Sequence, residues 1–270
     1  MIPTVLITGA SQGIGKATAL LFAQNGYNLV LASRRVEPLT ATAQEVQALG
    51  QKVLSVPCDV KDPQQVANLV NKALAEYGSI DVLINNAGIY SSGTVEDFSL
   101  EDWHQTIDTN LWGYIHTIHA LLPSMLARSS GTIVNLVSIA GKVPIAYLVP
   151  YSTSKFALTG LTEAMHSELK PKGIHVCGIY PNVIKSSLME RAIFRGKDEQ
   201  DAEARRNQLN QVISTPVVEK PEDVAKAIWD GVKNQRSEVL VGSANVAKAA
   251  YGVFPGLMQW VFRQGFKQKT

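Results

Sequence analysis

Short apolar runs rich in β-branched residues alternate with longer segments of helical length along most of this chain. The seven runs are Thr4–Thr8, Asn28–Ala32, Val53–Val56, Asp81–Asn85, Thr132–Ser138, Ile174–Tyr180 and Glu238–Val241. Near-continuous apolar runs are typical of parallel strands that are covered on both faces. Repeated strand–helix alternation therefore predicts a single doubly wound α/β domain with a seven-stranded parallel sheet and helices on both faces.

Composition narrows the class of protein further. The chain has 270 residues, of which 46% are hydrophobic and 18% charged, which excludes a disordered chain. The formal net charge of +2 is too balanced for a nucleic-acid-binding protein. Two cysteines cannot form a disulfide framework, and the first predicted strand begins at Thr4 without a secretory leader before it. We expect a cytoplasmic protein.

Local residue patterns predict where several helices begin and end. Asp62 precedes Pro63, which predicts an acidic N-cap followed by proline at the first helical position. The segment 99–102 resembles a capping box. Pro171 and Gly173 predict the end of the helix that begins near Tyr151, and Pro221 opens another helix.

A glycine-rich segment follows the first strand, with Thr8, Gly9, Gly13 and Gly15 in the pattern T-G-x-x-x-G-x-G. Glycine allows the backbone to turn tightly and to approach a pyrophosphate closely, and the next helix offers its N-terminal N–H groups to the anion. The position between a strand and a helix favours a dinucleotide site in a Rossmann-type fold, with strand order 3-2-1-4-5-6-7. The alternative is a structural turn without a ligand.

The second strand ends without the acidic residue that usually binds the ribose of NAD. Ser33, Arg34 and Arg35 stand there instead. Guanidinium groups pair well with a 2′-phosphate, so this cluster predicts NADP as the cofactor. The alternative is that both arginines are ordinary surface charges at the start of a helix.

Tyr151 and Lys155 are four residues apart on a predicted helix, which places them on one face. A free tyrosine has a pKa near ~10, and a neighbouring ammonium group favours its ionised form. The pair therefore predicts acid–base chemistry. Y-x-x-x-K alone is also compatible with a solvated helix face.

Taken together, these motifs resemble the short-chain dehydrogenase/reductase family, in its subfamily with T-G-x-x-x-G-x-G and Y-x-x-x-K, over about residues 4–242. Matching positions in the family's order are Asp59, the N-N-A-G motif of Asn85, Asn86, Ala87 and Gly88, Asn110 in the next helix, and Ser138 at the end of the fifth strand. The segment 181–186 matches the family's P-G-x-x-x-T in part, with Asn182 in place of glycine and Ser186 in place of threonine.

The resemblance implies hydride transfer between NADPH and a ketone or aldehyde, or the reverse reaction. It implies that Tyr151 exchanges the proton, Ser138 binds the substrate oxygen, Lys155 lowers the tyrosine pKa and binds the ribose, and Asn110 holds a relay water. The implied cofactor contacts are Gly9, Ser11, Gln12, Gly13, Ile14, Gly15, Ser33, Arg34, Arg35, Asp59, Val60, Asn86, Ala87, Gly88, Tyr151, Lys155, Pro181, Val183 and Ser186. The alternatives are a catalytically silent NADP-binding regulatory or scaffold protein and, with less support, an epimerase or dehydratase.

Two segments fall outside this pattern. The charged segment 186–215 is either a lid over the substrate or an exposed loop. The segment 243–270, beyond the expected domain of residues 1–242, contains an uncharged stretch from Ala249 to Phe262 that is too short to cross a bilayer. It either packs on the domain or a partner subunit, lies at a membrane surface, which would favour a lipid-like substrate, or is disordered.

The resemblance also implies a homodimer or homotetramer. We expect no metal site, although His116 and His119 share a helix face, because further ligands would have to converge on them.

Overall fold

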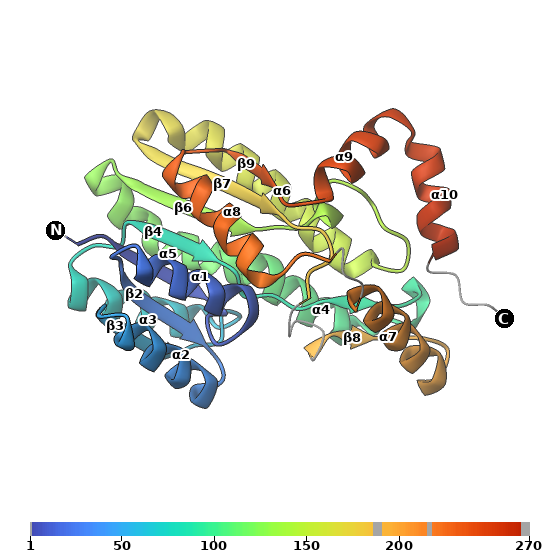
Figure 1. Ribbon diagram of the computed structural model, residues 1–270, viewed down its shortest axis with the longest axis horizontal. Helices are drawn as coiled ribbons and strands as arrows, with labels where there is room; N and C mark the ends of the chain where they lie inside the picture. Colours follow the sequence, from blue (N-terminus) through green and yellow to red (C-terminus); the bar gives the residue numbers. More distant parts are fainter. Residues whose placement is uncertain (1, 186–190, 215–217, 266–270) are drawn as a thin grey trace.

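Seven parallel strands form the central sheet of the protein, which we describe from a computed structural model for residues 2–185, 191–214 and 218–265 (Figure 1). The sheet order is β3-β2-β1-β4-β6-β7-β9. The strands are β1 (Thr4–Thr8), β2 (Asn28–Ser33), β3 (Val53–Pro57), β4 (Val82–Asn85), β6 (Gly131–Leu136), β7 (Ile174–Tyr180) and β9 (Glu238–Leu240). Counted along the sheet-forming strands alone, this is the predicted order 3-2-1-4-5-6-7, so the fold prediction is confirmed.

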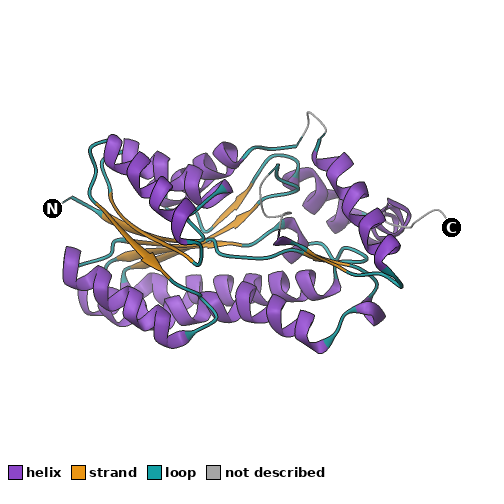
Figure 2. Ribbon diagram, turned by 90° about the horizontal axis from the view of Figure 1, so that it is seen from below, coloured by secondary structure: helices purple, strands orange, loops and turns teal. Residues whose placement is uncertain are grey.

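Helices cover both faces of the sheet (Figure 2). One face packs against α1 (Gly13–Gln24), α2 (Val36–Ala48) and α8 (Pro221–Lys233). The other packs against α3 (Pro63–Tyr77), α5 (Gly113–Arg128) and α6 (Val149–Leu169). This arrangement explains why the strands are apolar on both sides, because neither face of the sheet is left to water.

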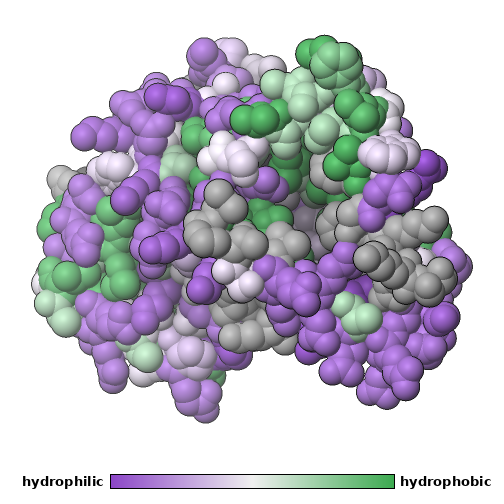
Figure 3. Space-filling model, turned by 45° about the vertical axis from the view of Figure 1, so that its right-hand side comes forward, coloured by the Kyte–Doolittle hydropathy of each residue, from purple (hydrophilic) through white to green (hydrophobic). Residues whose placement is uncertain are grey.

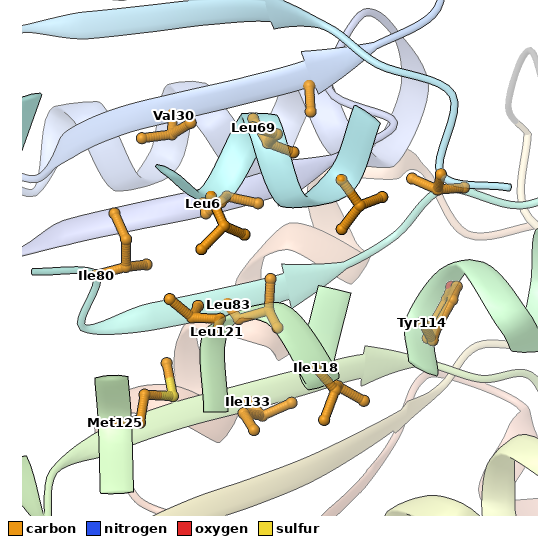
Figure 4. Packing of buried hydrophobic residues seen from close by; sticks show 14 of the residues in the cluster. Leu6, Val30, Leu69, Ile80, Leu83, Tyr114, Ile118, Leu121, Met125 and Ile133 are labelled. Carbon is orange, nitrogen blue, oxygen red and sulfur yellow. The ribbon is translucent and has the colours of Figure 1, made fainter. Parts of the chain in front are cut away.

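The larger apolar layer lies between the sheet and the α3, α5 and α6 helices (Figure 4). Leu6, Leu83 and Ile133 from adjacent strands face Leu69 of α3 and Leu121 of α5, and all five side chains are buried. Burial of this kind fixes the strand register, because a shift by one residue would turn each apolar side chain to the opposite face.

The predicted helix boundaries follow from their local signals. The Asp62 carboxylate accepts hydrogen bonds from the N–H groups of Gln64 and Gln65 at the start of α3. Ser99 and Asp102 form the expected capping box at the start of α4 (Leu100–Ile107). A left-handed Gly173 follows the short 3-10 turn after α6.

Two of the predicted catalytic residues lie in local structure that differs from the prediction. Strand β6 ends at Leu136 rather than at Ser138, because the chain turns into a 3-10 helix at 139–141 and the Ser138 hydroxyl accepts a hydrogen bond from the N–H of Ala140. Asn110 lies in a π-helical stretch, Asp108–Trp112, between α4 and α5 rather than in a regular helix.

The described part of the predicted lid is an ordered structure. Strand β8 (Ile193–Phe194) pairs in parallel with β5 (Ser91–Ser92) in a separate two-stranded sheet, and α7 (Glu199–Ile213) follows. Arg195 forms a two-point ion pair with the buried carboxylate of Asp102, with N–O distances of 2.8 and 2.6 Å. The segment is therefore attached to α4. Residues 186–190 and 215 of the predicted lid lie outside the described residues.

Two further helices, α9 (Ala244–Val253) and α10 (Pro255–Gly265), form the C-terminal extension. Ala244 is buried beside Ile139 and Val143, and α10 packs mainly against α9 (Figure 1). None of the helices within the described residues combines the length and hydropathy that a bilayer crossing requires.

Candidate active site

A cleft runs along the carboxyl-terminal edge of the sheet, where the turns after β1, β2, β4, β6 and β7 meet the start of α6. This edge is the usual ligand site of doubly wound sheets. The predicted site residues that line it are Gly9, Gln12, Gly13, Ile14, Ser33, Arg34, Asp59, Val60, Asn86, Ala87, Gly88, Ser138, Tyr151, Lys155, Pro181 and Val183. Ser11, Gly15, Arg35 and Asn110 support the cleft without lining it, and Ser186 lies outside the described residues.

The glycine-rich turn is held in place by Asn86. The Asn86 amide donates to the carbonyl oxygens of Thr8 and Gly9, at 2.9 and 3.1 Å. Gly9 has a φ of +65°, and a Cβ atom at Gly15 would lie 2.3 Å from the Gly9 carbonyl oxygen. These two positions therefore require glycine for the turn to close. The Gln12 side chain does not cap α1, so the N-terminus of this helix keeps N–H donors at the cleft.

The turn after β2 presents positive charge and hydroxyl groups. The Ser33 hydroxyl donates to the Ser11 hydroxyl at 2.9 Å, and Arg34 lies 3.8 Å from the Asp59 carboxylate. Within the described residues, the Nε and Nη2 atoms of Arg35 are buried without a hydrogen-bond partner. These unpaired donors favour an anionic group nearby.

Ser138, Tyr151 and Lys155 come together on the opposite wall of the cleft. Tyr151 and Ser138 are both buried and line the same part of the cleft. Lys155 is also buried and donates from its Nζ to the carbonyl oxygen of Leu136 at 2.9 Å. One turn of α6 separates Tyr151 from Lys155, as the spacing predicts, and the Lys155 Nζ lies 5.7 Å from the centre of the Tyr151 ring.

Burial dominates the electrostatics of this group. Burial raises the pKa of Tyr151 to about 12, although the neighbouring Ser138 hydroxyl acts in the opposite direction. It lowers the pKa of Lys155 to about 7. The expected lowering of the tyrosine pKa by Lys155 is therefore not observed in this structure, because removal from water disfavours both charged forms.

Asn110 is fully buried and its amide is occupied. Its Nδ2 donates to the carbonyl oxygen of Ile89 and to the Ser154 hydroxyl, at 2.9 and 3.1 Å. Its Oδ1 accepts from the N–H of Ile89 at 2.8 Å. The side chain thus fixes the chain after β4 against α6, and the relay water implied by the resemblance stays a prediction.

Sequence patterns did not reveal the apolar end of the cleft. Tyr90, Ile145, Leu148 and Leu209 line it, and the Tyr90 ring centre lies 5.1 Å from that of Tyr151. Burial, together with the nearby Tyr151, raises the pKa of Tyr90, so its hydroxyl stays neutral. These residues come from three separate segments, the chain after β4, the loop before α6, and α7, without a shared motif. A weak signal for Tyr90 is its place just after the N-N-A-G motif.

The part of the chain that the structure describes holds no cluster of metal-binding side chains. There, no three side chains of His, Cys, Asp or Glu gather as metal ligands would. His116 instead hydrogen-bonds the backbone oxygen of Val60 at 2.9 Å.

This combination of a Rossmann-type sheet, a glycine-rich turn and a Ser–Tyr–Lys group defines an oxidoreductase. More particularly, the chain belongs to the short-chain dehydrogenase family, whose model matches residues 3–198.

Individual relatives extend over nearly the whole chain. A ketoacyl reductase, HetN, from Nostoc is 34% identical over 249 residues, which cover 91% of this chain and 80% of that protein. The structure of a short-chain dehydrogenase/reductase from Burkholderia phymatum in complex with NAD superposes with a TM-score of 0.86, at 27% identity, over 96% of this chain and 95% of that one. A short-chain dehydrogenase from Sphingobium yanoikuyae in complex with NADPH gives 0.77, at 29% identity, over 95% of each chain.

Proposed function

We propose that this enzyme reduces an apolar ketone or aldehyde to the alcohol with NADPH. The observation that carries the proposal is that Tyr151, Ser138 and Lys155 are buried together in the same cleft as the glycine-rich turn and Arg34. A proton donor and an oxygen-binding hydroxyl beside a dinucleotide site suit a carbonyl that receives a hydride and a proton.

The residues present fit NADP. The N-terminus of α1 and the turn at Gly9 would hold the pyrophosphate, and Arg34 and Ser33 would hold the 2′-phosphate. Arg35 supports this assignment through its unpaired buried nitrogens. The assignment is further supported by the Sphingobium relative, which is complexed with NADPH, whereas the Burkholderia relative holds NAD.

When bound, the nicotinamide supplies the hydride. Tyr151 then donates its proton to the carbonyl oxygen, and Ser138 stabilises the negative charge that develops there. With a pKa of about 12, Tyr151 is protonated at neutral pH, which suits reduction better than oxidation. Lys155, held by the Leu136 carbonyl, would bind the ribose hydroxyl groups, and Asn110 fixes the chain after β4 against α6.

The apolar end of the cleft supports a substrate with a hydrophobic body. Tyr90, Ile145, Leu148 and Leu209 line it beside Tyr151. Part of this wall belongs to α7, so residues 186–215 are proposed as the substrate lid of a catalytic domain formed by residues 1–242.

We further propose a homodimer or homotetramer in the cytoplasm. Trp112 and Phe156, from the π-helical stretch and α6, are large apolar side chains with exposed fractions of 49% and 41%. A partner subunit would remove both from water. Sedimentation velocity of the wild type and of a Trp112→Glu variant tests this, since a monomeric wild type contradicts it.

The proposed activity is tested by following NADPH oxidation with a panel of ketones and aldehydes, with NADH in parallel. Turnover with NADPH and little with NADH is expected. Comparable rates with NADH would contradict the cofactor assignment but retain the oxidoreductase. Tight NADPH binding without turnover on apolar as well as polar carbonyls would instead support a silent cofactor-binding protein.

A further inference from the structure

The C-terminal extension carries a group of exposed apolar side chains that the catalytic site does not use. We call Val253, Phe254, Leu257, Trp260 and Val261 the C-terminal patch. Their exposed fractions run from 45% to 68%. Leu257, Trp260 and Val261 follow the spacing i, i+3, i+4, so they share one face of α10. Figure 3 shows apolar residues gathered on this side of the molecule, next to a hollow in the surface.

The patch residues do not contribute to the packed interior of the domain. The main packing partner of α10 is α9, and Met258, rather than the patch residues, is the half-buried side chain of its first turns. Gln259 lies between the patch residues along the chain and donates weakly to the Tyr251 hydroxyl at 3.5 Å. Helix α10 therefore has one face toward α9 and an apolar face toward solvent, which is unusual for so many large side chains.

The charge of the segment indicates which occupant suits this face. Residues 244–270 contain Lys248, Arg263, Lys267 and Lys269 and no Asp or Glu. Lys248 is paired with Glu238 at 2.6 Å, whereas the other three follow the patch in sequence. A second copy of this chain would bring two such basic segments together across a symmetric contact, which repulsion opposes. An anionic lipid surface would attract them.

We propose that the C-terminal patch docks the enzyme on the surface of a membrane that contains anionic lipids. Tryptophan is favoured at the boundary between lipid and water, and an apolar helix face beside basic residues lies in that boundary. Docking does not require a spanning segment.

Docking would also orient the cleft. Ala247 and Tyr251 of α9 pack against the same buried cluster (Ile139, Val143 and Ala244) as Ile145, and Ile145 also lines the apolar end of the cleft. The extension that carries the patch therefore shares one apolar cluster with the wall of the cleft. This consequence rests on the proposed reductase function, and it predicts a carbonyl substrate that is drawn from the membrane, with a long apolar chain.

Vesicle flotation of the full-length chain tests the proposal directly, with phosphatidylcholine vesicles that contain or lack phosphatidylglycerol. We expect binding to the anionic vesicles that weakens with added salt. The double variant Leu257→Ser/Trp260→Ser should bind at least about tenfold less, because both side chains insert. Arg263→Glu should lower binding to the anionic vesicles about fivefold and leave circular dichroism unchanged. The matched control, Val95→Ser/Leu100→Ser, removes two exposed apolar side chains elsewhere and should bind like the wild type.

Three results would overturn the proposal. One is absence of binding by the folded wild type. Another is equal loss of binding in the control and the patch variant. The third is a wild-type dimer that the patch variant dissociates without any effect of vesicles, which would assign the patch to a second copy.

Rates with a long-chain ketone in vesicles and with a water-soluble ketone separate this proposal from the reductase function. The patch variant should be slower than the wild type with the long-chain ketone and equal to it with the water-soluble ketone. Failure of the wild type on both ketones, with vesicle binding intact, would contradict the reductase function and leave the docking surface standing.

Discussion

The two ends of the cleft are built in different ways. The cofactor end is formed by the turns that follow the strands, and Asn86 in the turn after β4 donates hydrogen bonds to Thr8 and Gly9 in the turn after β1. The apolar end joins distant segments, since Tyr90 lies against Phe194 and Tyr151. A glycine-rich turn tolerates few residue types, whereas an apolar wall needs only suitable volume. The cofactor end should therefore be sensitive to single changes, and the substrate end should be tolerant of them.

The largest effect is expected where the two ends meet. Tyr151→Phe removes the proton donor and should lower kcat by about 10²–10⁴-fold, with NADPH binding retained. Steady-state NADPH oxidation and a separate binding titration check this. Tyr77→Phe, whose hydroxyl bonds the Leu29 carbonyl away from the cleft, is the matched control. Retention of more than a tenth of the activity would remove Tyr151 from the mechanism.

At the cofactor end, Asn86→Ala should destabilise the fold by about 2 kcal/mol, because the carbonyl groups of Thr8 and Gly9 lose their amide donor. Urea unfolding gives the change, and NADPH affinity should fall with it. The exposed Asn71→Ala serves as control. Equal stability of the two variants would show that the turn holds its shape without Asn86.

Lys155→Met should raise stability while it abolishes turnover, because burial lowers the pKa of Lys155 to about 7 from a usual value near 10.5. Below about pH 7 the lysine is charged in both folded and unfolded states, so its desolvation cost is fully present. As pH rises to about 10 the unfolded chain binds more protons than the folded one, and the cost disappears. Thermal unfolding should therefore show a gain of about 1–2 kcal/mol near pH 6 and little at about pH 10. A variant less stable than the wild type near pH 6 would contradict it.

Arg34→Ser should weaken NADPH binding about tenfold and leave NADH binding almost unchanged, since a charged hydrogen bond to the 2′-phosphate is lost. Fluorescence titration with both nucleotides measures the ratio. Arg236→Ser, an exposed arginine paired with Asp230 elsewhere, is the control. An equal loss for both nucleotides would remove the selective role of Arg34.

The smallest effect is expected at the substrate end. Arg195→Ala opens the two-point contact with Asp102, and the KM for substrate should rise about threefold with NADPH affinity unchanged. Arg195→Lys keeps the charge but not the paired geometry, so its KM for substrate should lie between those of the wild type and Arg195→Ala. A matching loss of NADPH affinity would show that the two ends are not independent.

The sequence was sufficient for the sheet, for its strand order and for the caps at Asp62 and Ser99, because alternation and capping are local patterns. It also predicted most of the cleft lining through motifs. It did not predict strands β5 and β8, since two residues each are too few to form a pattern. Nor did it predict the raised tyrosine pKa, which depends on burial by side chains from several segments. Nor did it predict the π-helical stretch at Asn110, whose side chain is hydrogen-bonded to Ile89 and Ser154.

The pairing of Ser91 with Ile193 has a consequence for the order in which the molecule folds. These residues lie about a hundred positions apart, so their contact closes a long loop at considerable entropic cost. Strands β6 and β7 of the central sheet lie between them in sequence. The small sheet should therefore form late in folding. A transient species would then have its nucleotide-binding turns folded while β8 is still unpaired.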